Sequence, residues 1–233
     1  MRHQPKQTPH SKRFSELRAK IDKTKSYPIE EAIKLAKETA TAKFDSSIDV
    51  AIRTGIDPAK SEQQIRSTTL LPHGTGKKIK IAVIAPPDKQ KEAKAAGANI
   101  VGGTEIIDAI AKTQKINFDI LVTMPEMMKD LAKVAKILGP KGLMPNPKTE
   151  TVTTNLKKTV EELAKGKISF KNDDTGNIHV SIGKASFDDK KLLDNYRAIM
   201  ETLNRVKPAT IKGIFLKNIT ISSTMGPGIR VQI

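Results

Sequence analysis

The feature that most constrains the fold is a central stretch in which short apolar runs alternate with helix patterns. Lys80–Ala85 has the sequence KIAVIA, Asn99–Val101 is a second brief run, and Asp119–Thr123 has the sequence DILVT. Helix patterns follow these runs over residues 87–96, 104–112 and 125–138. Short apolar strands separated by helices are typical of βαβ units, in which helices cover both faces of a mainly parallel sheet. The centre of the chain therefore predicts a three-layer βαβ domain.

On both sides of this stretch the hydrophobic period changes to two. Residues 47–53 alternate, and a second strand is expected near 64–71; this pair predicts an antiparallel sheet with one wet face. Farther on, strands at 167–170 and 178–182 flank a turn at Asn172–Asn177, which indicates a hairpin. A last strand is expected over 212–222. Helices are predicted after Pro28 to about residue 42, from 153 or 154 to 166, and over 188–206.

Two antiparallel-type segments around a βαβ segment favour two domains, one of them discontinuous. We predict an outer α+β domain with an antiparallel sheet, residues 1–74 and 167–233, and an inserted Rossmann-like domain, residues 75–166. Gly74 and Gly166 are predicted hinges, because glycine tolerates conformations closed to other residues; surface turns use glycine just as often.

The N-terminal region is basic. Residues 1–9 are predicted to be a disordered tail that precedes a short helix, and a mitochondrial presequence is the alternative interpretation.

Composition narrows the class of partner. Lys and Arg total 41 against 25 Asp and Glu, so the formal net charge is +16 and predicts a polyanionic partner, nucleic acid before anionic membrane. Residues 75–166 hold 16 lysines but no arginine, so all the arginines lie in the predicted outer domain. Arginine binds phosphates and bases bidentately and stacks on bases, which favours the outer domain as the nucleic-acid face. The chain has no cysteine, which fits a reducing compartment and excludes thiol chemistry.

The chain does not match the sequence motifs of phosphate-binding, dinucleotide-binding or metal sites. Gly142–Thr149 superficially resembles a phosphate-binding P-loop, but Pro147 replaces the glycine before the lysine, and prolines remove backbone donors. No G-x-G-x-x-G follows the 80–85 strand, and the four histidines lack metal-ligand spacing. We therefore predict no catalytic residue, no metal and no cofactor.

Two rival classes remain open. A Rossmann-type enzyme would show a melting temperature that nucleotides change. A basic membrane-surface protein would float with liposomes, although the chain lacks a basic amphipathic helix with large apolar anchors.

Six motifs together carry a family resemblance. They are TAKFDSSIDV (41–50), GIDP (55–58), LPHGTGK (71–77), GPKGLMPNPK (139–148), GKASF (183–187) and TMGP (224–227). From about Tyr27 to Val231 the chain resembles the family of the universal large-subunit ribosomal protein numbered one, bacterial type, which belongs to the mobile stalk beside the tRNA exit site. The family's architecture is similar to the one predicted above.

The resemblance implies a function. Members bind large-subunit (23S-type) rRNA at the stalk, assist release of deacylated tRNA from the exit site, and in bacteria repress translation of their own mRNA. It also implies a cytoplasmic, ribosome-bound protein, monomeric within the ribosome, with no enzymatic activity and no membrane partner.

The resemblance further implies where RNA binds, because the family's outer domain makes most of the RNA contacts. The matching positions are Lys43, Phe44, Ser46, Asn172, Asp173, Thr175, Gly176, His179, Ser223, Thr224, Met225, Gly226 and Pro227. Four basic residues of the same predicted domain join the set: Arg53, Lys167, Lys184 and Arg230. Hydroxyls and exposed backbone can bond ribose and phosphate, and Phe44 offers a flat surface.

Structural alternatives accompany these assignments. Phe44 could belong to the core, Met225 could only pack a turn, and residues 172–176 could be only a hairpin turn. Asp174 departs from the basic residue that many relatives carry, so we expect no RNA contact there. The proline-rich loop 139–148 is predicted to be a stiff connector that presents Lys141 and Lys148.

Overall fold

The computed structural model describes residues 11–22, 24–211 and 213–233, which form two compact units. The first unit contains the chain up to Gln64, residues 172–197 and residues 207–233; the second contains residues 65–171 and 198–206. These boundaries differ from the predicted ones at 74/75 and 166/167, and whether 75–166 is an inserted domain stays a prediction. The predicted tail, residues 1–9, lies outside the described residues.

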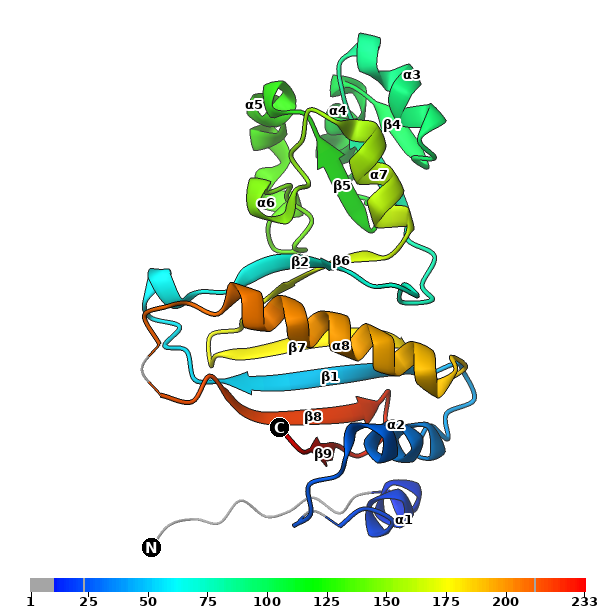
Figure 1. Cartoon of the computed structure of the whole chain (residues 1–233). Helices are drawn as coiled ribbons and strands as arrows, with labels where there is room; N and C mark the ends of the chain where they lie inside the picture. The colour runs from blue at the N-terminus through cyan, green and yellow to red at the C-terminus, as the bar shows by residue number, and fades with distance from the viewer. Residues whose placement is uncertain (1–10, 23, 212) are drawn as a thin grey trace, which may run out of the picture. The chain divides into compact units, whose positions relative to one another are not determined.

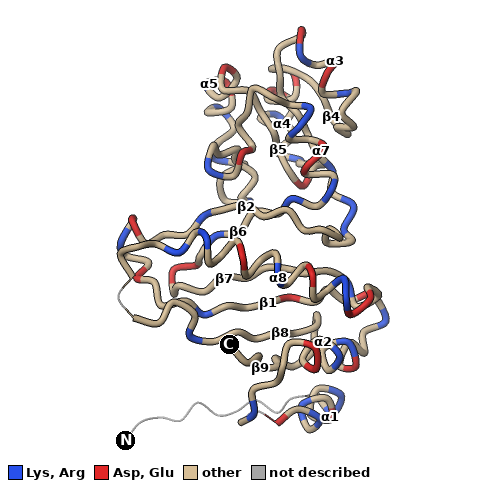
Figure 2. The backbone as a smooth tube through the Cα atoms, viewed as in Figure 1, with Lys and Arg blue, Asp and Glu red and all other residues tan. Residues whose placement is uncertain are grey.

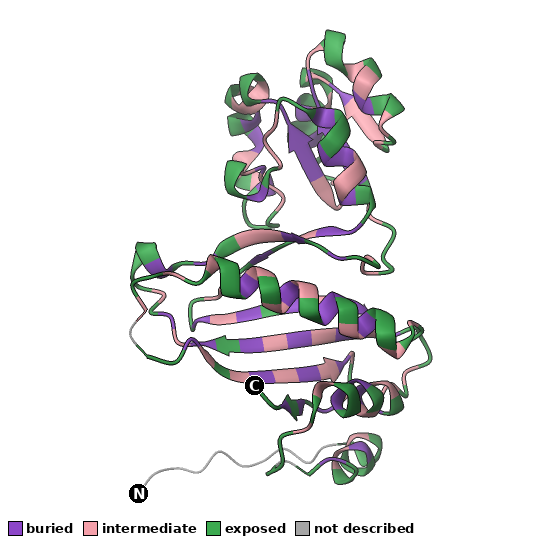
Figure 3. Cartoon of the chain, viewed as in Figure 1, coloured by how far each residue is buried: buried purple, intermediate pink, exposed green. Residues whose placement is uncertain are grey.

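The first unit is built on an antiparallel sheet with the strand order β7-β1-β8-β9 (Figure 1). Its strands are β1 (Ser47–Thr54), β7 (Asn177–Lys184), β8 (Leu216–Ser223) and β9 (Ile229–Val231). The alternation predicted for β1 is confirmed, since Ile48, Val50 and Ile52 are almost fully buried while their neighbours are not. Figure 3 shows the same alternation of buried and partly exposed positions along β8. Strand β9 was not predicted.

Helices cover one face of this sheet (Figure 1). They are α2 (Ile29–Glu38) and α8 (Asp189–Val206), of which residues 189–197 belong to this unit. The unit also contains α1 (Lys12–Ala19). Helix α2 begins after Pro28, buries Ala32, Ile33 and Ala36, and contacts β8 and β9. The fully buried Asn195 of α8 donates its amide N–H to the carbonyl of Ile182 at 2.7 Å, which ties the helix to β7. The odd-numbered residues of β1 are left on the opposite, open face.

The second unit contains the predicted parallel sheet, and its strand order is β4-β3-β5. Its elements are β3 (Ile81–Ile84), α3 (Pro87–Ala95), β4 (Ile100–Gly102), α4 (Thr104–Thr113), β5 (Ile120–Thr123) and α7 (Leu156–Ala164). Ile81 and Val83 pack with residues of α3 and α7, whereas Ala82 and Ile84 pack with residues of α4 and of 131–138. Successive residues of a strand point to opposite faces, so both faces are covered, as predicted.

The helix predicted over 125–138 is not continuous. It is divided into η2 (Pro125–Met127), α5 (Met128–Leu131), η3 (Ala132–Val134) and α6 (Ala135–Leu138). Leu131, Val134 and Leu138 are all fully buried, and the tighter 3₁₀ turns accompany their packing into one core.

The predicted pairing of the strands at 47–53 and 64–71 is wrong, and the hairpin predicted around Asn172–Asn177 forms only in part. β2 (Arg66–Leu70) pairs with β6 (Lys167–Lys171) in a separate two-stranded sheet, and not with β1. The expected hairpin of β6 and β7 is reduced to one bridge between Asn172 and Ile178. Period-two patterns identify strands but not their partners, because pairing depends on which faces are buried together. The last strand begins at Leu216 and not at residue 212, which lies outside the described residues.

The loop that follows α6 is held by its own hydrogen bonds. The carbonyl of Asn146 accepts from the N–H and hydroxyl groups of both Thr149 and Thr151, and its side chain caps η4 (Pro147–Thr149). Lys141 and Lys148 are exposed, in keeping with a stiff loop that presents two cations.

A further 3₁₀ turn, η1 (Ser61–Gln63), lies in the first unit. Among the described residues no helix has the length and apolar character needed to cross a bilayer.

The two predicted hinge glycines meet inside the second unit. Gly74 has a φ of 63° and Gly166 a φ of 107°. A Cβ added to Gly166 would lie 2.5 Å from the Cα of Gly74, so the two backbones touch. Gly166 therefore requires glycine for this packing, whereas an added Cβ at Gly74 would lie 3.5 Å from the nearest atom, and there only the left-handed φ favours glycine. The hinge role of both stays a prediction.

Candidate nucleic-acid interface

One group of predicted residues gathers where β1 begins and where β7 and β8 end; we call residues 43–47, 184 and 223–227 the sheet-end cluster. The N–H of Thr224 donates to the carbonyl of Ser47 at 2.9 Å, and the hydroxyl of Thr224 accepts from the N–H of Ser47 at 3.0 Å. The ammonium of Lys184 donates to the Ser47 hydroxyl at 3.0 Å and to the Asp45 carbonyl at 3.3 Å. Three segments far apart in the sequence thus form one surface.

Two large apolar side chains of this cluster face solvent. Phe44 is 57% exposed and Met225 66% exposed, so the alternative that placed Phe44 in the core is wrong. Met225 also has a φ of 63°, a left-handed conformation that raises the energy of a non-glycine residue by about 1–2 kcal/mol. Strained residues of this kind concentrate at functional sites.

The turn that carries Met225 is tightly built. The N–H of Gly226 donates to the carbonyl of Ser223 at 2.8 Å, and a Cβ at Gly226 would lie 2.2 Å from the Ser223 hydroxyl oxygen. A larger residue at position 226 would therefore force the buried Ser223 hydroxyl to move, and the hydrogen-bonded turn holds Met225 at the surface.

Arg13 of α1 joins two segments of the interface, which sequence analysis did not anticipate. Its guanidinium donates to the hydroxyl of Thr41 at 3.0 Å and to the carbonyl of Met225 at 3.1 Å. No motif marks Arg13; only its position in a basic N-terminal stretch hinted at a role.

Some predicted contact residues turn inward. Ser46 is 1% exposed, and its hydroxyl has no partner among the described residues; Ser223 is 2% exposed, and Pro227 is also buried. The hydroxyl of Thr224 is engaged with the Ser47 backbone. These residues shape the cluster, while Lys43, Phe44, Asp45 and Met225 are its exposed members. The carboxylate of Asp45 accepts from the N–H and the hydroxyl of Ser186, at 3.2 and 2.9 Å.

A second group lies on the open face of the sheet. The register places His179, Ala51, Thr220 and Arg230 side by side across four strands. Figure 2 shows that these strands carry few charges, so Arg53, His179 and Arg230 stand in a polar, weakly charged surface. Residues that sequence analysis missed also lie on this face: the small polar residues Ser181, Asn218, Thr220 and Ser222, and the acidic Asp49, which lies between Ser181 and Ser222 in the register. A polar residue at every second position of 218–222 was the available indication.

The third group is the turn before β7, at the opposite end of that strand. The carboxylate of Asp173 accepts from the N–H of Asn177 at 2.7 Å and from the N–H and hydroxyl of Thr175, both at 2.9 Å. These bonds, led by the backbone N–H of Asn177, lower the pKa of Asp173 to about 2. Gly176 has a φ of 81°, and its carbonyl accepts from Thr54. The side chain of Asp173 therefore organises its own turn, as the structural alternative held.

This turn should respond to acid in a defined way. A lowered pKa means that the ionised carboxylate stabilises the fold above its ordinary pKa of 3.8, and that this contribution is lost as pH falls through about 2. We expect the amide resonances of Thr175 and Asn177 to stay constant from neutral pH to about pH 4 and to shift together below it. Asp173→Asn should displace both resonances at neutral pH, whereas Asp174→Asn, in the same turn, should not. Titration of both amides near neutral pH would contradict this.

Lys167 does not belong with the other predicted RNA-binding residues. It lies in the second unit, is 8% exposed, and its ammonium contacts the carboxylates of Glu162, at 2.7 Å, and Glu150. Burial by itself would lower the pKa of Lys167, but the two carboxylates outweigh that effect and raise it. A buried ammonium whose charge is already balanced by two carboxylates is poorly suited to bind an RNA phosphate, so the assignment of Lys167 is corrected.

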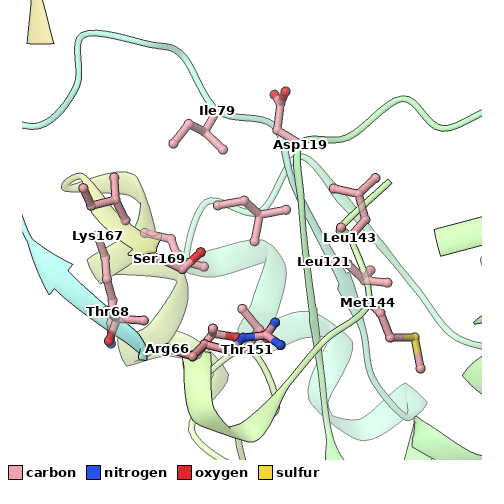
Figure 4. A pocket seen from close by; sticks show the side chains of 15 residues that line it. Arg66, Thr68, Ile79, Asp119, Leu121, Leu143, Met144, Thr151, Lys167 and Ser169 are labelled. Carbon is pink, nitrogen blue, oxygen red and sulfur yellow. The ribbon is translucent and has the colours of Figure 1, made fainter. Parts of the chain in front are cut away.

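The second unit contains a hollow of about 230 Å³ (Figure 4). Arg66, Thr68 and Ser169 of the two-stranded sheet line it, together with Leu121 and Asp119. The pKa of Asp119 is lowered, chiefly because its carboxylate accepts from the backbone N–H of Lys80 at 3.0 Å. With both signs of charge in its lining, this hollow indicates no ligand class. Among the described residues no three acidic or histidine side chains gather as a metal site.

Comparison with known proteins gives consistent matches over most of the chain. The model of the family described as "Ribosomal protein L1p/L10e family" matches residues 36–227. The chain is 50% identical over 223 residues to the large ribosomal subunit protein uL1 of Thermosipho africanus, covering 96% of each chain. It is 52% identical to the proteins of that name from Mycoplasma capricolum and Mesoplasma florum, covering 95% and 96% of this chain and 98% of each relative.

Proposed function

Since the chain belongs to the ribosomal protein L1p/L10e family, we propose that it is a structural protein of the large ribosomal subunit that binds large-subunit (23S-type) rRNA. Support comes from two independent directions. The relatives that match nearly the whole chain carry a large-subunit name, and the net charge of +16 suits a polyanionic partner.

The observation that carries the proposal is the sheet-end cluster. An exposed aromatic ring at Phe44 and an exposed, strained Met225 stand beside Lys43 and polar backbone. Proteins bind unpaired RNA by stacking bases on such rings and by bonding phosphates and ribose hydroxyls nearby. Aromatic residues make up only 3% of the chain, and exposing one of them, Phe44, gives up the free energy that burying its ring would contribute. An exposed ring at this position is therefore suited to stacking on an RNA base.

The interface has room for an extended RNA segment. Strand β7 joins the sheet-end cluster to the turn at 172–176, and its eight residues span about 24 Å at roughly 3.4 Å per residue. Between the two ends lie His179 and the small polar residues of the open face, which permit close backbone approach. This extent supports recognition of a folded RNA junction rather than a single base.

We further propose the finer roles expected of the family: placement at the mobile stalk, assistance in releasing deacylated tRNA from the exit site, and repression of translation of its own mRNA. A chain that recognises one rRNA junction can bind a similar fold in an mRNA, so a leader fragment of its operon should compete with rRNA for the same surface. This role is cytoplasmic, non-enzymatic and carried out by one copy per ribosome.

The proposed architecture is an outer α+β domain interrupted by a Rossmann-like inserted domain. Its support is that the first unit contains both chain ends while the parallel sheet lies within 65–171. Just past the crossings, Arg66 pairs with Lys171, so the insert leaves and returns at adjacent points. In the structure Arg66 and Arg205 belong to the second unit. The arginines are therefore not confined to the outer unit, which weakens the inference that arginine marks that unit as the RNA-binding one.

Binding of rRNA fragments at several salt concentrations tests the proposal. If Lys and Arg contact several phosphates, log affinity should fall linearly with log salt, with a slope of about −0.7 to −0.9 per contact. Phe44→Ala should weaken binding by about 1–3 kcal/mol through lost stacking, and it should leave the free energy of unfolding almost unchanged because the ring is exposed.

Leu70→Ala is the matched control, since Leu70 is also half-exposed but lies in the second unit. A flat salt dependence, or equal losses of affinity in the Phe44 and Leu70 variants, would count against the proposed interface.

A further inference from the structure

The second unit has another hollow, which the proposed function does not use. The loop of residues 73–79 forms one wall, Gly97 and Asn99 a second, and the end of α7 with Gly166 a third. Its volume is about 510 Å³, and Ile79, Ile81 and Leu163 contribute apolar surface. We call it the glycine-loop hollow.

Its lining has one sign of charge. Three lysines, Lys77, Lys78 and Lys165, take part, and no carboxylate does. The ammonium of Lys77 is paired with Asp119 at 3.3 Å. Lys78 and Lys165 are exposed and form no ion pair within the described chain, although Lys165 lowers the pKa of Glu162 from a distance. The hollow therefore keeps two lysine ammonium groups that no carboxylate contacts directly.

The loop also offers unused backbone donors. Gly74 and Gly76 have φ values of 63° and 71°, and such left-handed residues among ordinary ones form concave arrays of N–H groups. The N–H groups of Thr75, Gly76 and Lys78 have no acceptor in the part of the chain that the structure describes.

Asn99 adds a side-chain donor. Its amide oxygen accepts from the N–H of Ile81 at 2.9 Å, which fixes the side chain, and its NH₂ group has no partner among the described residues. Donors from the loop and from the segment after α3 thus line the same hollow as the two free lysines.

We propose that the glycine-loop hollow binds a phosphate group, carried by a free nucleotide or by the 5′ end of an RNA. A phosphate offers several acceptor oxygens and negative charge, and charge-assisted bonds from lysines and backbone N–H groups are the strongest that such a site can make. Residues 73–78, HGTGKK, contain no proline, so they keep the donors that Pro145 and Pro147 remove from the superficially P-loop-like segment. The apolar surface accommodates the ring system of a nucleotide.

The test is an amide-resonance titration of the full chain with four probes: inorganic phosphate, ATP, and one short oligoribonucleotide with either a 5′-phosphate or a 5′-hydroxyl. We expect saturable shifts at Thr75, Gly76 and Lys78. Replacing Lys78 and Lys165 together by glutamine should weaken binding by about tenfold or more, since two charge-assisted bonds are lost. Lys112→Gln with Lys115→Gln, which removes the same charge from exposed positions of the same unit outside the hollow, should change it less than twofold.

The probes also separate the two sources. Saturation by ATP alone assigns a free nucleotide, saturation only by the 5′-phosphorylated strand assigns an RNA end, and saturation by both assigns the shared phosphate. Shifts that merely follow ionic strength, equal weakening in both double variants, or no saturable shift with any probe would overturn the proposal. Phe44→Ala, in the other unit, should leave the phosphate titration unchanged. The phosphate proposal can therefore be refuted without refuting the proposed rRNA interface, and the reverse also holds.

Discussion

Replacing Gly166 by alanine is expected to lower the free energy of unfolding of the second unit by about 3 kcal/mol. The φ of 107° strains any L-residue, by about 1–2 kcal/mol. The added Cβ would also lie 2.5 Å from the Cα of Gly74, a contact with backbone that cannot rotate away. Overpacking of this kind adds about 1–3 kcal/mol. Urea unfolding with amide exchange, which reports on each unit separately, measures the loss.

Gly97→Ala is the matched control for this change. Gly97 has a similar φ of 95°, but nothing lies within 4 Å of an added Cβ, so only the strain of about 1–2 kcal/mol remains. Equal losses at the two positions would show that the contact between Gly74 and Gly166 contributes nothing.

The same variant tests the proposed architecture. If residues of the second unit fold as an inserted domain, Gly166→Ala should leave rRNA affinity unchanged at temperatures where the first unit is folded. Loss of rRNA affinity in parallel with loss of stability would mean that the two units unfold as one, against the proposal.

Replacing Thr224 by valine should lower the free energy of unfolding of the first unit by about 1–3 kcal/mol, because the N–H of Ser47 loses its acceptor. The hydroxyl of Thr224 also donates to the Ser47 carbonyl at 3.2 Å, so its removal loosens the link between β1 and the turn that carries Met225. Affinity for rRNA should then fall as well, because the turn no longer presents Met225 in one position.

Thr224→Ser keeps the hydroxyl and should retain most of the stability. Paired measurements of unfolding and rRNA affinity separate the possibilities. Weaker binding with unchanged stability would show that the hydroxyl acts on RNA directly and that its bonds to Ser47 matter little. Lower stability with unchanged binding would make the residue a purely structural part of the turn.

The residues of the proposed interface show that local sequence does not predict which side chains are exposed. Phe44 and Ser46 are two positions apart, yet one is 57% exposed and the other 1% exposed. Both stand before β1, where no periodic pattern indicates which way a side chain turns. Distant segments fix the backbone here: Thr224 and Lys184 bond to Ser47, and the N–H of Ala185 donates to the carbonyl of Ser46 at 2.8 Å. The family resemblance named residues that the structure brings together at one end of the sheet, but it could not separate those that face solvent from those that hold the surface together.

Strands, helices and their approximate ends follow from local chemistry. The three apolar runs became the parallel sheet because strands buried on both faces must be apolar throughout, and β1 shows its alternation because one of its faces stays open. Pro28 before α2 and the alternation at 216–223 are also local signals, because each acts on residues close to it in the sequence. They can therefore be recognised without knowledge of the tertiary structure.

Pairing and exposure were decided by the tertiary structure. β2 joins β6 and β7 joins β1, although the sequence pattern equally allowed β1 with β2 and β6 with β7. A strand's edge carries the same N–H and C=O groups whatever its side chains, so its partner is chosen by which apolar faces can be buried together across the whole chain. Lys167 illustrates the consequence: its charge is plain in the sequence, but only the approach of Glu150 and Glu162 makes it an internal ion pair rather than a cation for RNA.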